Sequence, residues 1–469
     1  MIKIAKFLFA LLSVAVIAGA WVMYTTIAPR LDAEQKQLSE DSDEYLSRKI
    51  YDVGIDLVNR ALQIDTDRNA NLWRKLADAY SASGDSAQYR STLQIMISGG
   101  ILPDGEKLED LYLELYRQQQ LDRPPKETLA LLKEGIRKTD SDRLREIYGA
   151  ERWQTVDGRY TFDEAYVLTG GTGLVRIEEN WGYVGSSGSM IIRPSFELAT
   201  NFAASGRDVY AVVYKNGELF VINRSGLRRA LADEYAGLEV EELARFTGKH
   251  FSAKLPGQND FAIFEWGDGL LSGYLQPVIA QLENRYEFYG LTSDGLTAVK
   301  ADGAWHIRGS ETIARDRSFD EIAVDELGRC TAPGAGALFV KTGGSYNMIG
   351  YDGSQIAGPF EDAKPFFSQD GWAAVKNNGK WGFADASGKL VIDYIYEDAN
   401  SSSGITAGIS EEILAPVRQD GLWGYIKTDG AFAIPPQYDD AKQFVNGCAP
   451  VKKEAVGGWF YILLAEYAP

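Results

Sequence analysis

The sequence predicts a multidomain protein, in which an apolar N-terminal helix precedes a small all-α domain and a long all-β repeat array. Three observations predict this order. An apolar run opens the 469-residue chain, apolar residues then recur at helical spacing, and a tryptophan-containing motif recurs through the rest. We expect residues 1–28, 29–44, 45–150 and 160–469 to form a membrane anchor, a polar stalk, the helical domain and the β array.

The composition favours strands and excludes several kinds of site. The 48 glycines, 10 tryptophans and 25 tyrosines favour short strands joined by tight turns. A net charge of −18 repels nucleic acid, so we expect no nucleic-acid partner. The cysteines, Cys330 and Cys448, and the histidines, His250 and His306, are too few and too widely spaced for a zinc site. We therefore expect buried thiols rather than a disulfide, and no metal or cofactor.

The apolar run from 7 to 27 follows two lysines and is long enough to cross a bilayer as a helix. A cleaved signal peptide is the alternative, because Ala18-Gly19-Ala20 resembles a cleavage site. The run continues past that site through Trp21 and Tyr24, which suit the outer membrane interface. This favours an uncleaved signal anchor with the bulk of the chain exported, in the periplasm or outside the cell.

Helical periodicity follows the charged segment 32–44, which we interpret as a stalk. From Tyr45 onward, apolar residues recur at the spacing of one helix face. Gly84 interrupts the pattern, which then resumes. Two further helices are expected over 106–119 and 125–138.

One part of this region resembles tetratricopeptide repeats. Trp73, Leu76, Ala77 and Tyr80 match the start of the 34-residue pattern, and Gly84 matches its turn. The resemblance covers roughly residues 50–140. It implies helix pairs stacked around a concave, peptide-binding surface, and the alternative is a plain spacer bundle.

The strongest pattern is a pair of motifs that alternate through the C-terminal region. The first is Gly379-Lys380-Trp381-Gly382-Phe383, which recurs as Gly421-Leu422-Trp423-Gly424-Tyr425 and, more weakly, around Trp181, Trp305 and Trp459. The second is an aromatic residue, one or two acids and usually alanine, as in Phe360–Ala363, Tyr396–Ala399 and Tyr438–Ala441. A period of about 20–50 residues is typical of solenoids, propellers and arrays.

These motifs resemble the WG-repeat family of bacterial proteins, from Phe162 to Tyr461 and over about eight units. Tryptophan buries a large apolar area, and the glycine after it permits close approach of another backbone. We therefore expect these residues to form the structural core of the repeats: Trp181, Trp305, Trp381, Gly382, Trp423, Gly424 and Trp459.

The ends of the array predict that it closes. Phe162-Asp163-Glu164-Ala165 is a second motif that precedes every first motif, while the first motif at Trp459 has no complete second motif after it. The N-terminal copy would complete the final unit. We therefore expect a propeller-like ring of about 7–8 units rather than an open superhelix.

Recurring acids and two insertions are the remaining candidates for chemistry. Glu397-Asp398 and Asp439-Asp440 could serve as the paired carboxylates of a glycoside hydrolase. Because they recur with the repeat, whereas catalysis needs one asymmetric constellation, we interpret them as turn caps and assign no catalytic residue. We expect 400–404 to be a flexible inserted loop and 232–246 an inserted acidic helix.

The sequence thus favours a membrane-anchored, envelope-exposed binding or scaffolding protein, not an enzyme, whose array binds another protein. Two alternatives remain, since a fold does not determine a function. A module that binds cell-wall carbohydrate or peptidoglycan would present exposed aromatic side chains. A glycoside hydrolase would have a deep acidic pocket with carboxylates of separated pKa values.

Overall fold

The computed structural model describes residues 21, 23–64, 69–155, 160–205, 208–229, 237–271, 274–290, 294–309, 317–404 and 413–464. The chain forms two compact units, Met1–Glu151 and Arg152–Pro469. Among the described residues, no helix is both long and apolar enough to span a membrane. Most of the apolar run from 7 to 27 lies outside the described residues.

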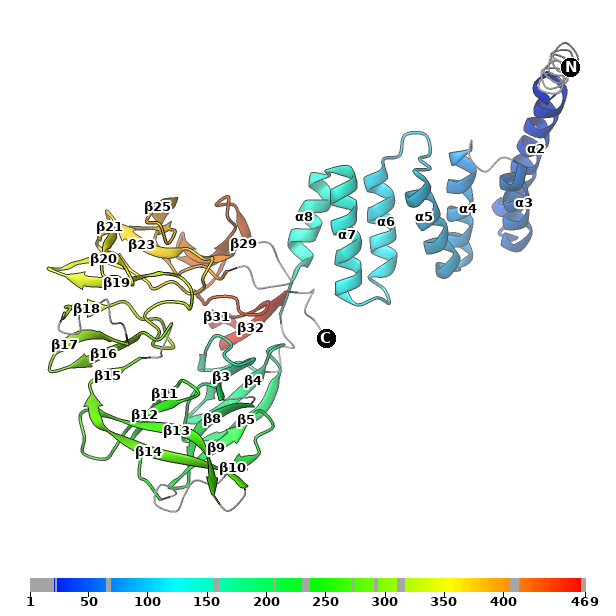
Figure 1. Ribbon diagram of the computed structural model, residues 1–469. Helices are drawn as coiled ribbons and strands as arrows, with labels where there is room; N and C mark the ends of the chain where they lie inside the picture. Colours follow the sequence, from blue (N-terminus) through cyan, green and yellow to red (C-terminus); the bar gives the residue numbers. More distant parts are fainter. Residues whose placement is uncertain are drawn as a thin grey trace, which may run out of the picture. The chain divides into compact units, whose positions relative to one another are not determined.

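The described residues of the first unit form helices and their connections, and in Figure 1 helices α4 to α8 lie side by side in chain order. After the π-helical turn η1 (Met23–Ile27), its helices are α2 (Ala28–Ser47), α3 (Tyr51–Ile64), α4 (Ala70–Ser83), α5 (Ser86–Gly99), α6 (Leu108–Gln119), α7 (Pro125–Thr139) and α8 (Asp142–Glu151).

The segment expected to be a polar stalk, 29–44, lies instead within α2 and packs on α3. Leu38 is buried in one apolar cluster with Val58 and Ala61 of α3, and Gln35 donates to the carbonyl of Ala61 at 3.0 Å. A few buried positions such as Leu38 are enough for α2 to pack on α3, although most of its other residues are charged or polar. The composition of the segment therefore concealed its role.

The tetratricopeptide-like segment forms the helix–turn–helix that the sequence predicts. Gly84 ends α4 in the left-handed conformation with φ 82°, which a residue with a Cβ rarely adopts. Asp85 then caps α5 by accepting the N–H of Gln88. The two helices expected further on are α6 and α7.

Three helices of this unit meet at a partly buried ion pair. Arg74 of α4 donates from Nη1 and Nη2 to the two carboxylate oxygens of Glu114 on α6, both at 2.8 Å. Tyr89 of α5 also donates to Glu114. Burial opposes the charge on Glu114, but the hydrogen bonds from Arg74 and Tyr89 outweigh it and hold the pKa of Glu114 below its ordinary value.

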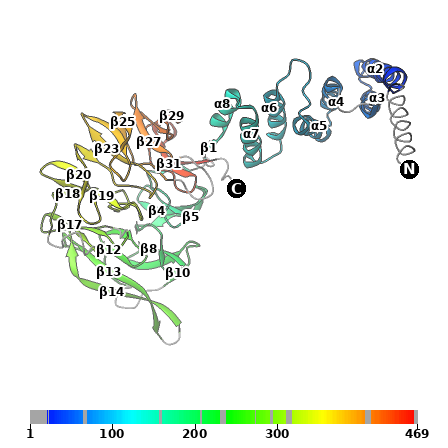
Figure 2. The ribbon, with the colours of Figure 1, turned by 45° about the horizontal axis from the view of Figure 1, so that its top comes forward.

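The second unit is an eight-bladed β-propeller, shown in two orientations in Figures 1 and 2. Each blade is one antiparallel sheet, and in blades 1 to 7 the strands follow chain order. Blade 1 is β2 (Glu164–Ala165), β3 (Thr172–Ile177), β4 (Asn180–Gly185) and β5 (Met190–Phe196); blade 2 is β6 (Leu198–Ala199), β7 (Ala203–Ser205), β8 (Asp208–Lys215), β9 (Glu218–Asn223) and β10 (Arg228–Arg229); blade 3 is β11 (Glu242–Phe246), β12 (His250–Lys254), β13 (Phe261–Leu271) and β14 (Tyr274–Tyr286); blade 4 is β15 (Phe288–Tyr289), β16 (Thr297–Ala301) and β17 (Ala304–Arg308).

The remaining blades continue the ring. Blade 5 is β18 (Glu321–Ile322), β19 (Ala337–Thr342), β20 (Ser345–Gly350) and β21 (Gln355–Phe360); blade 6 is β22 (Asp362–Ala363), β23 (Ala373–Asn377), β24 (Lys380–Ala384) and β25 (Leu390–Tyr396); blade 7 is β26 (Asp398–Ala399), β27 (Ala415–Gln419), β28 (Leu422–Ile426) and β29 (Phe432–Tyr438); blade 8 is β30 (Asp440–Ala441), β31 (Cys448–Lys453), β32 (Gly458–Leu464) and β1 (Trp153–Thr155).

Blade 8 closes the ring with residues from both ends of the unit. Phe162 and Trp459 exchange two backbone hydrogen bonds, each 2.8 Å long. This confirms the expected closure through the N-terminal copy of the second motif. The structure adds a strand that the sequence did not reveal, because β1 pairs antiparallel with β32 and becomes the last strand of blade 8.

The propeller core lies between neighbouring blades. At the seam between blades 8 and 1, one buried apolar cluster combines Phe162 and Val175 with Trp459 and Tyr461. Similar clusters join blade 1 to 2, 2 to 3, and each pair from 4 to 8. Tyrosines two positions after the repeat tryptophan also donate across three interfaces: Tyr183 to the carbonyl of Thr200, Tyr425 to Lys442 and Tyr461 to Tyr166.

Two expected insertions belong to the blades instead. Residues 242–246, expected to end an acidic helix, are strand β11, which pairs with β12; the start of that segment lies outside the described residues. The run 400–404 is not a flexible loop, because Ser401, Ser402 and Ser403 are buried. Serines 401 and 402 accept backbone N–H groups from the neighbouring blade, so their polarity reflects buried hydrogen bonding rather than exposure.

We expect Glu114→Gln to lower the free energy of unfolding of the helical unit by about 2 kcal/mol near neutral pH, because charge-assisted hydrogen bonds across three helices are weakened. The lowered pKa means that the ionised carboxylate stabilises the fold above the unfolded-state pKa of about 4.3, and that this contribution disappears as the pH falls through the folded-state pKa. Denaturant titrations followed by circular dichroism should therefore show the difference shrinking below about pH 4.

The matched control is Glu127→Gln, because Glu127 pairs with Arg123 on an exposed face. We expect that change to alter stability by less than about 0.5 kcal/mol. Equal effects of the two substitutions would contradict the role assigned to Glu114.

Candidate functional site

The predicted core tryptophans stand one to a blade and do not converge on a site. Trp381, Trp423 and Trp459 are buried, while Trp181 and Trp305 are half-buried. Each faces the aromatic residue of a second motif across the sheet. The pairs are Trp181 with Phe196, Trp305 with Phe319, Trp381 with Tyr396, Trp423 with Tyr438 and Trp459 with Phe162. Trp305 is followed by His306, which is also half-buried and packs within blade 4.

The glycine after the tryptophan is required by the close approach of the fourth strand. A Cβ on Gly382 or Gly424 would lie 2.6 or 2.5 Å from the carbonyl oxygen of Ile392 or Ile434. Both blades have an irregular register at this point, which brings the outer backbone over the glycine. These two predicted residues are therefore structural.

In blade 5 the glycine that permits the close approach of the two strands lies on the fourth strand instead of the third. Asn347 stands at the glycine position after Tyr346, and Gly358 occupies the facing strand. A Cβ on Gly358 would approach the Asn347 side chain at 2.9 Å and the Tyr346 carbonyl oxygen at 3.0 Å. One small residue is needed at this crossing, and either strand can supply it.

The first acid of each recurring pair caps a turn, as the sequence predicts, whereas the second acids Asp398 and Asp440 do not: Asp398 pairs with Lys364, and both line a second cavity described below. Glu397, for example, accepts the backbone N–H of Gly421 in the hairpin between the second and third strands, at 3.0 Å. Seven blades repeat this bond, with the acid and the donor residue being Asp163 and Glu178, Glu197 and Asn216, Glu287 and Gly303, Asp320 and Gly343, Glu361 and Gly379, Glu397 and Gly421, and Asp439 and Glu454. These carboxylates link the first strand of a blade to its central hairpin.

The cysteines lie in two different apolar clusters, Cys330 between blades 4 and 5 and Cys448 between blades 8 and 1. Cys330 and Cys448 are free and buried, which confirms the expected thiols. Burial raises the pKa of each thiol to about 12, so neither is a nucleophile near neutral pH. Within the described part of the chain, no group of three or more histidine, cysteine or acidic side chains is placed to hold a metal ion.

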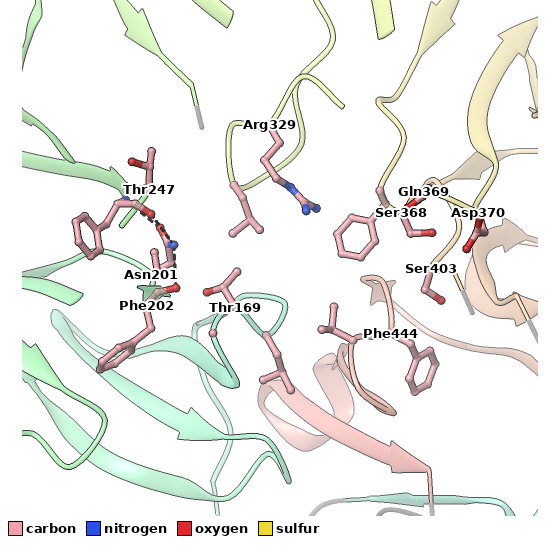
Figure 3. A pocket seen from close by; sticks show the side chains of 18 residues that line it. Thr169, Asn201, Phe202, Thr247, Arg329, Ser368, Gln369, Asp370, Ser403 and Phe444 are labelled. Atoms are coloured by element: carbon pink, nitrogen blue, oxygen red, sulfur yellow. Dashed lines mark hydrogen bonds between the residues drawn. The ribbon is translucent and has the colours of Figure 1, made fainter. Parts of the chain in front are cut away.

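The candidate site is a cavity of about 580 Å³ at the propeller axis, which we call the axial cavity (Figure 3). Seven blades contribute to it, each through the segment that follows its first strand. Its lining residues are Leu168, Thr169, Gly170, Asn201, Phe202, Ala203, Phe246, Thr247, Leu327, Arg329, Phe367, Ser368, Gln369, Asp370, Ser403, Gly404, Phe444 and Val445. Such a mixed wall of apolar and polar groups is typical of ligand-binding cavities.

Hydrogen bonds between blades fix part of this wall. Asn201 of blade 2 is buried and donates from Nδ2 to the carbonyl of Phe246 at 3.1 Å, while its Oδ1 accepts the N–H of the same residue at 3.2 Å. Figure 3 shows these bonds as dashed lines. The side chain therefore clamps blade 2 to blade 3 and positions Phe202 and Thr247 beside it.

One long segment of blade 5, residues 323–336, reaches across the ring. Its Leu327 packs with Val167 of blade 1 and Phe367 of blade 6 in a small apolar cluster. Its Glu326 accepts the backbone N–H of Val167 at 3.0 Å and pairs with Lys442 of blade 8 at 2.5 Å. The segment thus reaches the far side of the ring and holds both blades that meet at the seam.

A second cavity, also of about 580 Å³, is the polar cavity. It is lined by charged residues of blades 5 to 8, including Glu326, Asp440 and Lys442. In it, Lys364 pairs with Asp398 at 3.1 Å and lies 4.9 Å from the centre of the Trp381 ring. Burial raises the pKa of Asp440.

Sequence reasoning missed the residues that shape the axial cavity, among them Asn201, Arg329 and Ser368. They lie outside both repeat motifs. One signal was available: the stretch after the second motif is longer in blade 5, at 323–336, than in blade 6, at 364–372. Added length between fixed motifs marks the place where a blade departs from the repeat.

We expect Gly382→Ala to destabilise the propeller by about 1–3 kcal/mol, because the new methyl group overlaps the Ile392 carbonyl. Gly237→Ala is the matched control, since nothing lies within 4 Å of a Cβ at that position. Thermal unfolding of the two variants should separate them. A Tm for Gly382→Ala equal to that of the control would contradict the conclusion that the close approach of the Ile392 carbonyl requires a glycine at this position.

Part of the propeller matches a known protein family. The family model described as WG containing repeat matches residues 181–218, 359–381, 381–423 and 423–456. No curated protein matches the chain.

The chain is also similar to solved structures at low identity. Hsv2 of Kluyveromyces lactis is 10% identical, with 64% of this chain and 97% of that chain covered and a TM-score of 0.30. For virginiamycin B lyase of Staphylococcus aureus the identity is 12%, the coverage 56% and 94%, and the TM-score 0.29. PorZ of Porphyromonas gingivalis is 11% identical, with 64% and 51% covered and a TM-score of 0.23. The chain therefore carries WG repeats over residues 181–218 and 359–456, which include the tryptophan–glycine pairs of blades 1, 6 and 7.

Proposed function

We propose that the chain is a binding and scaffolding protein, not an enzyme, and that its propeller holds a protein partner at the axial cavity. The observation that carries this proposal is the convergence of segments from seven blades on one cavity. The first acid of each second motif, by contrast, is engaged as a turn cap, as Glu361, Glu397 and Asp439 show. The segments that differ from blade to blade therefore line the axial cavity.

The lining favours a protein segment over a sugar polymer. Sugar binding by stacking needs aromatic faces that are open to solvent. The phenylalanines of the cavity, Phe202, Phe246, Phe367 and Phe444, are buried and offer an apolar wall instead. Backbone and side-chain polar groups around that wall suit the mixed surface of a peptide.

The location of the protein belongs to the same proposal. We propose that the apolar run from 7 to 27 anchors the chain in a membrane with the propeller exported, on the length of the run and the lysines before it. The helical unit between them would act as a spacer or as a second binding surface.

Crosslinking of the full chain in intact cells, followed by mass spectrometry, tests the scaffolding proposal. We expect specific proteins to be captured by the full chain and lost from a variant that lacks 152–469, a deletion that removes β1 with the rest of the propeller. Gln369→Trp, at an exposed position of the cavity wall, should reduce the same capture by blocking entry.

Gln437→Trp is the matched control, because Gln437 is exposed on β29 and outside the cavity. Capture that survives deletion of the propeller would remove this domain from protein binding. Equal loss with Gln369→Trp and Gln437→Trp would place the partner elsewhere on the propeller.

A further inference from the structure

Arg329 brings a positive charge to the axial cavity, and Asp325 fixes its position. One carboxylate oxygen of Asp325 accepts the backbone N–H groups of Leu327 and Arg329, at 3.0 and 2.8 Å. The other oxygen accepts Nε of Arg329 at 2.7 Å. The guanidinium lies over the ring of Phe367, with 4.9 Å between Cζ and the ring centre. It is therefore held in place before any ligand arrives.

This arrangement leaves donors without acceptors. Nη2 of Arg329 and Oγ of Ser368 are buried, and neither has a hydrogen-bond partner among the residues that the structure describes. A guanidinium stays charged and carries five N–H groups, of which Asp325 takes only the one on Nε. Buried donors of this kind are destabilising unless an acceptor reaches them. Both side chains line the axial cavity, where a ligand could supply that acceptor.

The charges in the lining favour a single negative charge on the ligand. Of the described lining residues, Arg329 is the one cation and Asp370 the one carboxylate. Asp370 is exposed and forms no ion pair with Arg329 in the described part of the chain. A dianionic phosphate would face Asp325 and Asp370 with one cation to balance it. A carboxylate carries one charge, and its plane matches the fork of a guanidinium.

The shape of the axis favours the end of a chain. The cluster of Val167, Leu327 and Phe367, with Val445 packed on it, occupies the axis. Leu327 lines the axial cavity while its neighbour Glu326 lines the polar cavity, so this segment separates the two. A peptide that had to pass through the ring would be blocked there, whereas a peptide that ends in the cavity would not.

We propose that the axial cavity binds the C-terminal carboxylate of a partner protein. Arg329 and Ser368 donate to the carboxylate, and an apolar last side chain packs against the wall that includes Phe202 and Phe444. This inference rests on the proposed function, because it names the part of the partner that enters the same cavity.

Isothermal titration calorimetry on the full chain tests it with three acetylated peptides. The first ends in Ala-Ala-Leu with a free carboxylate, the second has the same residues with a C-terminal amide, and the third carries its only carboxylate on a glutamate side chain inside an amidated peptide. We expect the first to bind at least about tenfold more tightly than either of the others, because only it places a carboxylate at a chain end.

Variants of the protein locate the contact. Arg329→Gln should weaken binding of the free-carboxylate peptide about 10- to 100-fold, and Arg329→Lys, which keeps the charge but loses the planar fork, should fall between Arg329→Gln and the unmodified chain. Arg418→Gln, an identical change at an exposed residue of the polar cavity, should leave binding unchanged. Thermal unfolding of each variant establishes that the propeller remains folded.

Four results would overturn the assignment. They are equal binding of the amidated peptide, undiminished binding to a folded Arg329→Gln chain, loss of binding with Arg418→Gln instead, and no binding of the free-carboxylate peptide at concentrations of about 1 mM. A galacturonic acid trimer that bound at Arg329 when the peptide did not would indicate a sugar acid and also overturn it. Cellular capture that depends on the propeller, without binding of the free-carboxylate peptide, would leave the scaffolding proposal standing and remove this one.

Discussion

The propeller depends on one contact between residues that lie almost 300 positions apart, the paired backbone hydrogen bonds between Phe162 and Trp459. In blades 1, 6 and 7 an aromatic residue at the end of the fourth strand faces the tryptophan and follows it closely in the chain. At the seam that residue must come from the opposite end of the domain. The loop-closure entropy of joining such distant segments opposes closure, and the buried cluster of blades 8 and 1 offsets it. Strand β1 adds a second set of hydrogen bonds at the same place.

Blade 5 strengthens the same seam from inside the ring. Glu326 binds Val167 of blade 1 and Lys442 of blade 8, so one side chain bridges the two blades that the closure joins. Lys442 also lies over the rings of Tyr166 and Trp459, which are residues of those two blades. The segment that carries Glu326 also carries Leu327 and Arg329. Closure of the ring and the shape of the axial cavity therefore depend on a single stretch of chain.

The sequence predicts the periodic part of this structure and little of the rest. The tryptophan–glycine motif, the acidic turn caps and the stray motif at Phe162 were sufficient to anticipate a closed ring of about eight units, because each reflects a local constraint that recurs in most blades. Strand β1 was missed because three residues outside the motifs carry no periodicity. The serines 401–403 were misinterpreted because composition alone cannot distinguish a polar group that is buried and hydrogen-bonded from one that is exposed. The role of Arg329 was not predicted, because the ring of Phe367 that it lies over belongs to another blade and neither residue is part of a repeat motif.

The positions that repeat in the blades and the segments that line the axial cavity differ in how they can affect ligand specificity. A residue that occupies the same position in every blade meets nearly the same surroundings each time, so Glu361 and Glu397 perform one task twice and cannot distinguish a ligand. The segments after the first strands differ in length and composition, and those of seven blades line the axial cavity. Substitutions there can alter the cavity while the hydrogen bonds and glycine crossings that hold the blades stay intact. Within the sheets, by contrast, a change must be compensated. In blade 5 asparagine replaces the glycine after the aromatic residue, at Asn347, and the facing strand has a glycine, Gly358, where the two backbones approach.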